Sequence, residues 1–275
     1  MLIDTHCHLN FKAFDENLDE VINQANEAGV KKIVVPGTDI QTSYKAIQIA
    51  QKYDGVYAAV GIHPHHVFEI YKSSIPFSRK QKNRKSLLEK VSSLLKQKKV
   101  VAIGEVGIDR YIYKKTKYEK YQIDEEFINL QKEFFLEQAK LAYENKKTLI
   151  IHNREAKNDL LNILSSNLFL LKNKLVFHCC EPDEELLEFA KKHNIFIGVD
   201  GDVVYWKKKQ EFVKKIPIEL LVLETDSPFL SPTHQFPNEP KNITVVAEFI
   251  AKLKAIEVEK IKEITTRNAK NLFKI

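Results

Sequence analysis

The stretch LIDTHCHLN, residues 2–10, decides the fold of this chain. It opens with an apolar run that is typical of a buried strand, and two histidines, His6 and His8, follow within it. Side chains alternate across a strand, so residues two apart point the same way. The two imidazoles can therefore bind one divalent ion together, although as an isolated pair they fit two surface histidines equally well.

Four further apolar runs end in a side chain that binds metals. They are VVAIGE (100–105), TLIIH (148–152), KLVFH (174–178) and LLVLETD (220–226), ending in Glu105, His152, His178 and Asp226. Each residue alone has a plainer interpretation as an ion-pair partner, a core histidine or a turn aspartate. Five strands that end this way are hard to explain by packing alone.

Four histidines and two carboxylates suit a binuclear site for Zn²⁺, Mn²⁺ or Mg²⁺. We expect one ion to be held by His6, His8 and Asp226, and the other by His152 and His178. Glu105 would bridge them, since each of its oxygens can take one ion. Two ions about 3.5–4 Å apart activate water and clamp an in-line displacement at phosphorus.

Strand-like runs alternate with helical patterns along the whole sequence, which favours a parallel sheet. Strands are expected at 1–6, 31–36, 56–62, 100–105, 147–152, 174–179, 194–199 and 220–225. Helices are expected near 15–28, 41–53, 86–98, 124–145, 155–166, 183–193, 207–215, 239–254 and 258–271. A barrel of eight strands and eight helices takes about 250 residues. The 275 residues suit one such domain, 1–275.

A doubly wound open sheet is the competing architecture. That fold usually opens with a glycine-rich loop after its first strand, whereas here His-Cys-His-Leu-Asn (6–10) follows. A closed barrel also explains how five strands reach one place, because sites in such barrels lie at the C-terminal ends of the strands. The sequence therefore predicts the α/β class and a single (β/α)8 TIM barrel, with a metal site at those ends.

The net charge of +6 is unevenly placed. Residues 71–99 hold ten lysines and arginines and one acid, Glu89, so the rest of the chain is at −3. Within this segment, 79–85 is expected to be a loop and is the candidate for disorder. Three cysteines without a disulfide framework, and no apolar run of about 18 residues, indicate a reduced, cytoplasmic protein with no membrane partner.

The chain resembles the TatD family of metal-dependent hydrolases, within the amidohydrolase-like superfamily. The matching stretches follow the family's order over nearly the whole chain: IDTHCHL (3–9), GIHPH (61–65), AIGEVGID (102–109), IIHNR (150–154), VFHC (176–179), LETDSPFLSP (223–232), NEP (238–240) and TRNAKNLF (266–273). The resemblance implies a (β/α)8 barrel and a divalent-metal-dependent deoxyribonuclease, with Mg²⁺ as the first choice of ion. It also implies that the six residues above are the metal ligands and that Asp226 is the base for the attacking water.

Further residues are candidates for contact with substrate. His63, His65 and Arg154 are suited to phosphate oxygens. The alternatives are that His63 only forms a hydrogen bond to a metal ligand and that Arg154 pairs with an acid. Glu239 of NEP is expected to orient a neighbouring group. The sequence departs from the family pattern at the basic segment 71–99, at Arg110 and at the run Cys179-Cys180-Glu181-Pro182. The last two departures lie in loops at the mouth of the site and concern substrate preference.

Basic loops follow three of the expected strands, at 79–85, 111–121 and 205–209, and in the last two lysines are interleaved with aromatic residues. Such loops fit single-stranded DNA, because cations hold phosphates and rings stack on bases; the alternative is an ordinary solvated face. We therefore expect a phosphodiesterase that acts on DNA from single-stranded or frayed ends, with Asp226 and Glu105 as catalytic residues. The alternatives are an ester hydrolase such as a D-aminoacyl-tRNA deacylase, and a non-catalytic nucleic-acid-binding barrel.

Overall fold

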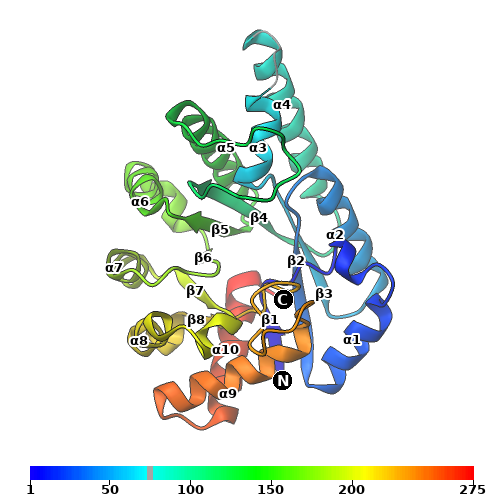
Figure 1. Cartoon of the computed structure of the whole chain (residues 1–275), viewed down its shortest axis with the longest axis vertical. Helices are drawn as coiled ribbons and strands as arrows, with labels where there is room; N and C mark the ends of the chain where they lie inside the picture. The colour runs from blue at the N-terminus through cyan, green and yellow to red at the C-terminus, as the bar shows by residue number, and fades with distance from the viewer. Residues whose placement is uncertain (73–76) are drawn as a thin grey trace.

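Eight parallel strands form one sheet in the computed structural model, which describes residues 1–72 and 77–275 (Figure 1). Each strand pairs with the next along the chain: β1 (Leu2–Asp4), β2 (Val30–Pro36), β3 (Val56–Val60), β4 (Val100–Asp109), β5 (Thr148–Arg154), β6 (Leu175–Phe177), β7 (Phe196–Val199) and β8 (Leu221–Leu223). Backbone hydrogen bonds from Thr5 N–H to the Leu223 carbonyl and from Asp226 N–H to the His6 carbonyl join β1 to β8. The prediction of a (β/α)8 barrel is confirmed.

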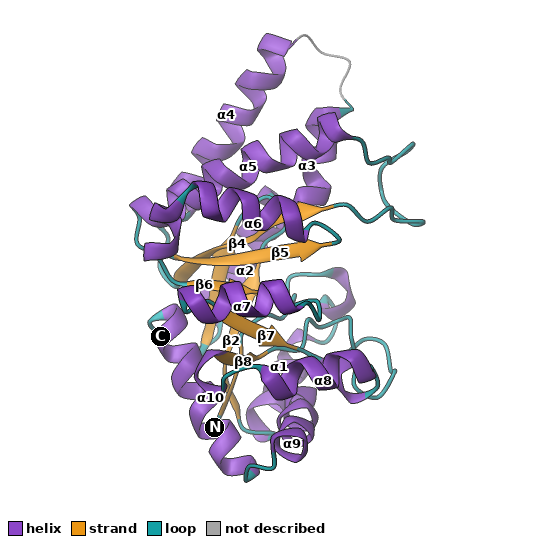
Figure 2. Cartoon of the chain, turned by 90° about the vertical axis from the view of Figure 1, so that its left-hand side faces the viewer, coloured by secondary structure: helices purple, strands orange, loops and turns teal. Residues whose placement is uncertain are grey.

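Helices surround the strands on the outside (Figures 1 and 2). They are α1 (Leu18–Glu27), α2 (Ile40–Lys52), α3 (Pro64–Tyr71), α4 (Phe77–Leu94), α5 (Glu125–Glu144), α6 (Lys157–Ser166), α7 (Glu184–His193), α8 (Lys207–Lys215), α9 (Ile243–Lys254) and α10 (Val258–Phe273). The sequence pattern did not predict α3. Among the described residues, no helix has the length and apolar character needed to cross a membrane.

The inside of the barrel is a packed apolar layer to which every strand contributes a buried side chain. These are Ile3, Val34, Ala59, Ala102, Ile150, Val176, Phe196 and Val222. Ala269, Leu272 and Phe273 of α10 pack on the same layer, and Thr148 at the start of β5 donates a hydrogen bond to the Leu272 carbonyl. Because α10 covers the N-terminal ends of the strands, the C-terminal ends are left as the face on which a site can form.

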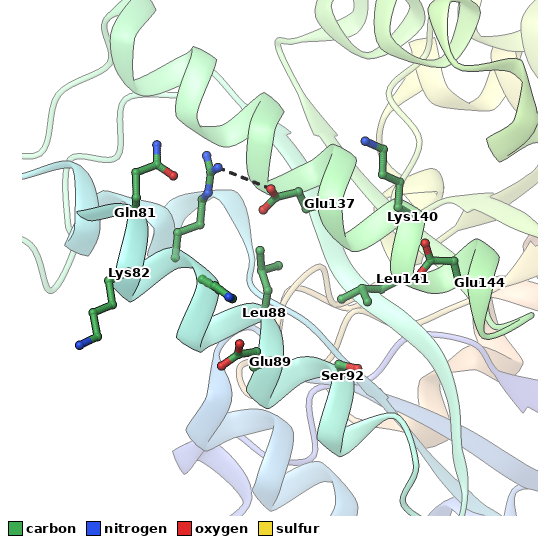
Figure 3. Close-up of a pocket in the computed structure, with 11 residues that line it drawn as sticks. Gln81, Lys82, Leu88, Glu89, Ser92, Glu137, Lys140, Leu141 and Glu144 are labelled. Carbon is green, nitrogen blue, oxygen red and sulfur yellow. Dashed lines mark ion pairs between the residues drawn. The ribbon is translucent and has the colours of Figure 1, made fainter. Parts of the chain in front are cut away.

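Residues 79–85 form part of α4, so the expectation of a loop there is wrong. Lysine, arginine and glutamine are good helix formers, and the helix buries Val91 against the core. α4 lies outside the barrel beside α5 (Figure 2), and Figure 3 shows the groove between the two helices. Arg84 pairs across this groove with Glu133 and, at 3.5 Å, with Glu137. The basic stretch therefore belongs to the outer ring of helices.

Candidate metal centre

The structure brings all six expected ligand residues together at the C-terminal ends of the strands. His6 and His8 follow β1, Glu105 lies within β4, His152 lies within β5, His178 follows β6 and Asp226 follows β8. The expectation that Glu105 and His152 end their strands is wrong, because β4 continues to Asp109 and β5 to Arg154. The barrel thus gathers residues from distant parts of the sequence into one cluster.

Side-chain atoms of His6, His8 and Glu105 have the spacing of a ligand set, and Asp226 lies beside them. Nε2 of His6 lies 3.2 Å from Nε2 of His8. Glu105 Oε2 lies 3.4 and 3.6 Å from these two nitrogens, and Asp226 Oδ1 lies 3.7 and 3.4 Å from them. Bonds of about 2.0–2.1 Å to a tetrahedral ion place its ligand atoms about 3.3 Å apart. His6, His8 and Glu105 therefore each offer one atom to a single divalent ion, and Asp226 Oδ1 borders the two imidazoles of this group.

The other carboxylate oxygen of Glu105 faces a second group. Oε1 lies 2.7 Å from His152 Nδ1, 3.5 Å from His63 Nε2 and 3.6 Å from His178 Nε2. His178 Nε2 is also 3.8 Å from Asp226 Oδ1. Glu105 is almost fully buried, and its two oxygens point to different histidine groups. This is the arrangement that a carboxylate bridging two ions requires.

Two buried acids that sequence reasoning missed hold the outer nitrogens of the histidines. Asp109 Oδ2 lies 3.1 Å from His152 Nε2, and Glu224 Oε1 lies 3.1 Å from His178 Nδ1. Histidines that bind metal usually donate their other N–H to a carboxylate, which fixes the ring orientation. Both acids belong to strand-like apolar runs, where a buried charge needs a partner. This feature of the sequence could have identified them.

Burial and the neighbouring carboxylates shift the pKa values of the clustered histidines in opposite directions. Burial, reinforced by His178, lowers the pKa of His6 to about 3. Burial opposes the charged form of His178 and His152, but Glu224 and Glu105 raise the pKa of His178 to about 10, and Asp109 with Glu105 raises that of His152 to about 9. The cluster thus favours positive charge on His152 and His178. A divalent ion would supply positive charge in the same place, so metal ions and protons compete for these nitrogens. The donor set therefore fits divalent metal.

A cavity of about 600 Å³ opens above the cluster. Its lining includes three of the residues expected to contact phosphate, His63, His65 and Arg154. The Arg154 guanidinium lies 3.8 Å from the centre of the Tyr111 ring, and its Nη1 donates to the Tyr113 hydroxyl at 3.3 Å. These tyrosines hold Arg154 at the cavity wall, where it can reach an anion.

The two histidines of GIHPH have different surroundings. His63 precedes α3, where its Nδ1 accepts a hydrogen bond from His65 N–H at 3.1 Å, and its Nε2 faces Glu105, which favours the alternative of a contact within the metal cluster. His65 Nε2 lies 2.8 Å from Thr116 Oγ1, and burial lowers the pKa of His65 to about 4. His65 is therefore neutral at pH 7 and is a weaker partner for phosphate than Arg154.

Glu239 lies outside this cavity lining. Its carboxylate Oε2 is 2.7 Å from Lys241 Nζ, and its backbone N–H donates to Asn238 Oδ1 at 2.9 Å. The described contacts of the Glu239 carboxylate are thus with Lys241. A role for Glu239 at the metal cluster stays a prediction.

Two of the aromatic and basic loops are more buried than the sequence suggests. Lys209 is fully buried, with its Nζ 2.9 Å from Asp200 Oδ2 and 2.6 Å from Asp202 Oδ1, so this lysine of the 205–209 loop is turned into the protein. Tyr118 is also buried and packs with Tyr121 around Phe68. These rings are not free to stack on bases, whereas other residues of the same loops remain exposed.

Replacing Lys209 with methionine is expected to destabilise the fold by about 3 kcal/mol, because removing one partner of a buried ion pair leaves uncompensated charge. The change leaves Asp200 and Asp202 buried without their cation. Urea unfolding of Lys209→Met measures the loss, with Lys208→Met at the exposed neighbouring position as the control. Equal stability of the two variants would contradict the structural role of this ion cluster.

Comparisons with known proteins agree on one family. The family described as TatD related DNase matches residues 3–274. The chain is 37% identical over 280 residues to the metal-dependent hydrolase YabD of Bacillus subtilis, covering 100% of both proteins. It is 30% identical over 275 residues to the human deoxyribonuclease TATDN3, covering 99% of this chain and 94% of that protein. The crystal structure of YjjV, a TatD homologue from Escherichia coli, has a TM-score of 0.84 and 28% identity, and the match covers 100% of this chain and 98% of that one.

Proposed function

The chain belongs to the TatD family of metal-dependent hydrolases, and we propose that it hydrolyses phosphodiester bonds of DNA from single-stranded or frayed ends. The observation that carries the proposal is the position of Glu105, whose two oxygens face separate histidine groups. The human relative named a deoxyribonuclease supports DNA as the substrate. A cavity at one end of the barrel suits a strand terminus better than continuous duplex.

The proposed centre holds two divalent ions, with Mg²⁺ first and Zn²⁺ or Mn²⁺ as alternatives. His6, His8 and Asp226 would hold one, His152 and His178 the other, and Glu105 would bridge them. When bound, such ions supply a more acidic water and neutralise charge on the phosphoryl oxygens. The residues themselves fix the geometry of the reaction and accept its proton.

Asp226 is the proposed base for the attacking water. Its side chain is 14% exposed, whereas that of Glu105 is 4% exposed, so Asp226 is the more accessible of these two carboxylates. It also lines the cavity. A carboxylate in this position can take a proton from a water molecule that approaches a phosphate above the cluster.

Arg154 is proposed to bind a phosphate oxygen of the substrate. Replacing it with alanine is expected to lower kcat/KM by about 10–100-fold, since a hydrogen bond to a charged group is worth about 1.5–3 kcal/mol. Arg154→Lys should recover part of the loss because it keeps the charge but loses the planar fork. Steady-state kinetics on single-stranded DNA test this, with Arg79→Ala on α4 as the control. An unchanged kcat/KM for Arg154→Ala would contradict the assignment.

Metal removal tests the proposed function as a whole. Chelator-treated protein is expected to release no nucleotides from end-labelled single-stranded DNA, and restored Mg²⁺, Mn²⁺ or Zn²⁺ should return cleavage. Single strands should be cut faster than blunt duplex of the same sequence. The apo and metal-restored forms serve as each other's control, with metal content measured in both.

Hydrolysis of a carboxylic ester is the second candidate, because the same cluster and base could act at a carbonyl carbon. A charged D-aminoacyl-tRNA should therefore be assayed beside the DNA. Deacylation without nucleotide release, in protein with its ions restored, would replace the nuclease proposal. DNA binding with no turnover of either substrate would support the non-catalytic barrel.

A further inference from the structure

Polar and apolar residues line opposite sides of the cavity. Polar residues that follow or end β3, β4 and β5 line one side: His63, His65, Tyr113 and Arg154. Apolar residues that follow β7, β8 and β1 line the other: Trp206, Phe229, Leu230 and Phe11. In a ring of eight strands, β4 and β8 stand opposite each other, and Figure 1 places β4 and β5 above β7, β8 and β1. The metal cluster therefore lies between a polar wall and an aromatic wall.

We propose that Trp206 and Phe229 form the subsite for the terminal nucleobase of the DNA strand. This inference rests on the proposed function and adds the direction in which the strand enters the cavity. The terminal base stacks on the aromatic wall, the scissile phosphate lies over the metal cluster, and the continuing strand leaves past Arg154.

The rings of this wall are open to a ligand. Trp206 is 41% exposed and Phe229 is 46% exposed, although both line the cavity. Phe11 supports Phe229 edge to face at 6.1 Å between ring centres, and stacks on His8 at 4.4 Å. The aromatic wall is thus continuous with the metal cluster, so a stacked base would be next to the phosphate that reacts.

The charges near the wall favour a base over a phosphate. Asp202 lines the cavity and lies beside Trp206, whereas Glu181 lies on the side of Arg154, where its carboxylate accepts from the Glu155 backbone N–H. Asp202 is already paired with Lys209, which is buried and cannot turn to the substrate. Among the described residues lining the cavity, the permanent cation is Arg154, on the opposite side. Phosphates are therefore drawn toward Arg154 and bases toward Trp206.

The segment that carries Trp206 is held in place before any ligand arrives. The backbone N–H groups of Tyr205 and Trp206 both donate to the Asp202 carbonyl, at 3.1 and 2.9 Å. The Asp202 side chain is anchored by Lys209. A rigid aromatic platform loses little conformational freedom when a base stacks on it, and stacking of one base on an aromatic side chain is worth about 1–3 kcal/mol.

The test compares two oligonucleotides that differ only in the terminal nucleotide, 2-aminopurine in one and an abasic residue in the other. Wild-type protein is expected to cleave the first with a kcat/KM at least about tenfold higher. Trp206→Ala and Phe229→Ala should lose most of this preference while cleaving the abasic strand as wild type does. They should also lose the quenching of 2-aminopurine fluorescence that binding produces. Tyr205→Ala is the matched control, since Tyr205 is 43% exposed but lies against His234, outside this cavity lining.

Other results would overturn the inference. A preference that survives in both variants would show that the terminal base is bound elsewhere, and an equal loss on both strands would reduce the wall to a packing role. If no DNA is cut but D-aminoacyl-tRNA is deacylated, the proposed function itself fails. A selective loss of deacylation in Trp206→Ala and Phe229→Ala would then show that the aromatic wall binds the amino-acid side chain of the aminoacyl-tRNA.

Discussion

Replacing Glu105 with glutamine is expected to lower phosphodiester cleavage by about 10³-fold or more, within the range for loss of a group at the reacting centre. Glutamine keeps the shape of the side chain but replaces one oxygen with an amide NH₂, which cannot accept a proton or bind a cation. Glu105 Oε2 faces His6 and His8, while Oε1 faces His152. One of these groups therefore loses its shared carboxylate oxygen.

The amount of bound metal separates this effect from a loss of folding. Glu105→Gln should bind fewer ions per chain than the wild type under the same restoration conditions, while circular dichroism stays unchanged. Glu133→Gln on α5 is the control, because Glu133 pairs with Arg84 on the outside of the barrel. A Glu105→Gln protein with wild-type cleavage and a full complement of ions would contradict the bridging role.

The barrel could be predicted because apolar strand-like runs alternate with helical patterns, and five of these runs end in a side chain that binds metals. The convergence of His6, His152 and His178 follows from strand order alone once the sheet closes. The length of β4 could not be predicted in the same way. Its continuation to Asp109 depends on pairing with β5, where Ile108 and Asp109 align with Asn153 and Arg154.

Long-range pairing explains the other differences between expectation and structure. Lys209 stands in a run of lysines, and its burial depends on Asp200 and Asp202 lying beside it after the chain turns. Glu224 belongs to an apolar run. Its contact with His178, 46 residues earlier in the sequence, forms only in the folded barrel. A side chain's type is visible in sequence, whereas its compensating partner is fixed by tertiary packing.

Replacing Asp226 with asparagine is expected to lower the rate of the chemical step by about 10³–10⁴-fold, because asparagine has the size of aspartate but cannot accept the proton of the attacking water. The backbone at this position should persist, since the Asp226 N–H donates to the His6 carbonyl at 2.9 Å whatever the side chain. Arg154 and the aromatic wall are untouched, so the affinity for single-stranded DNA should change little.

Single-turnover cleavage and fluorescence anisotropy measure these two quantities separately on the same DNA. The expected pattern is slow chemistry with nearly normal binding in Asp226→Asn, and the same loss of chemistry in Asp226→Ala with reduced metal content as well, because Asp226 Oδ1 lies 3.4 Å from His8 Nε2 within the ligand set. If Asp226→Asn retains a rate within tenfold of the wild type, another group takes the proton. Glu105 is a poor substitute, because it is nearly inaccessible and its two oxygens are committed to the histidines on either side. Such a result would instead indicate that a group of the substrate accepts the proton of the attacking water.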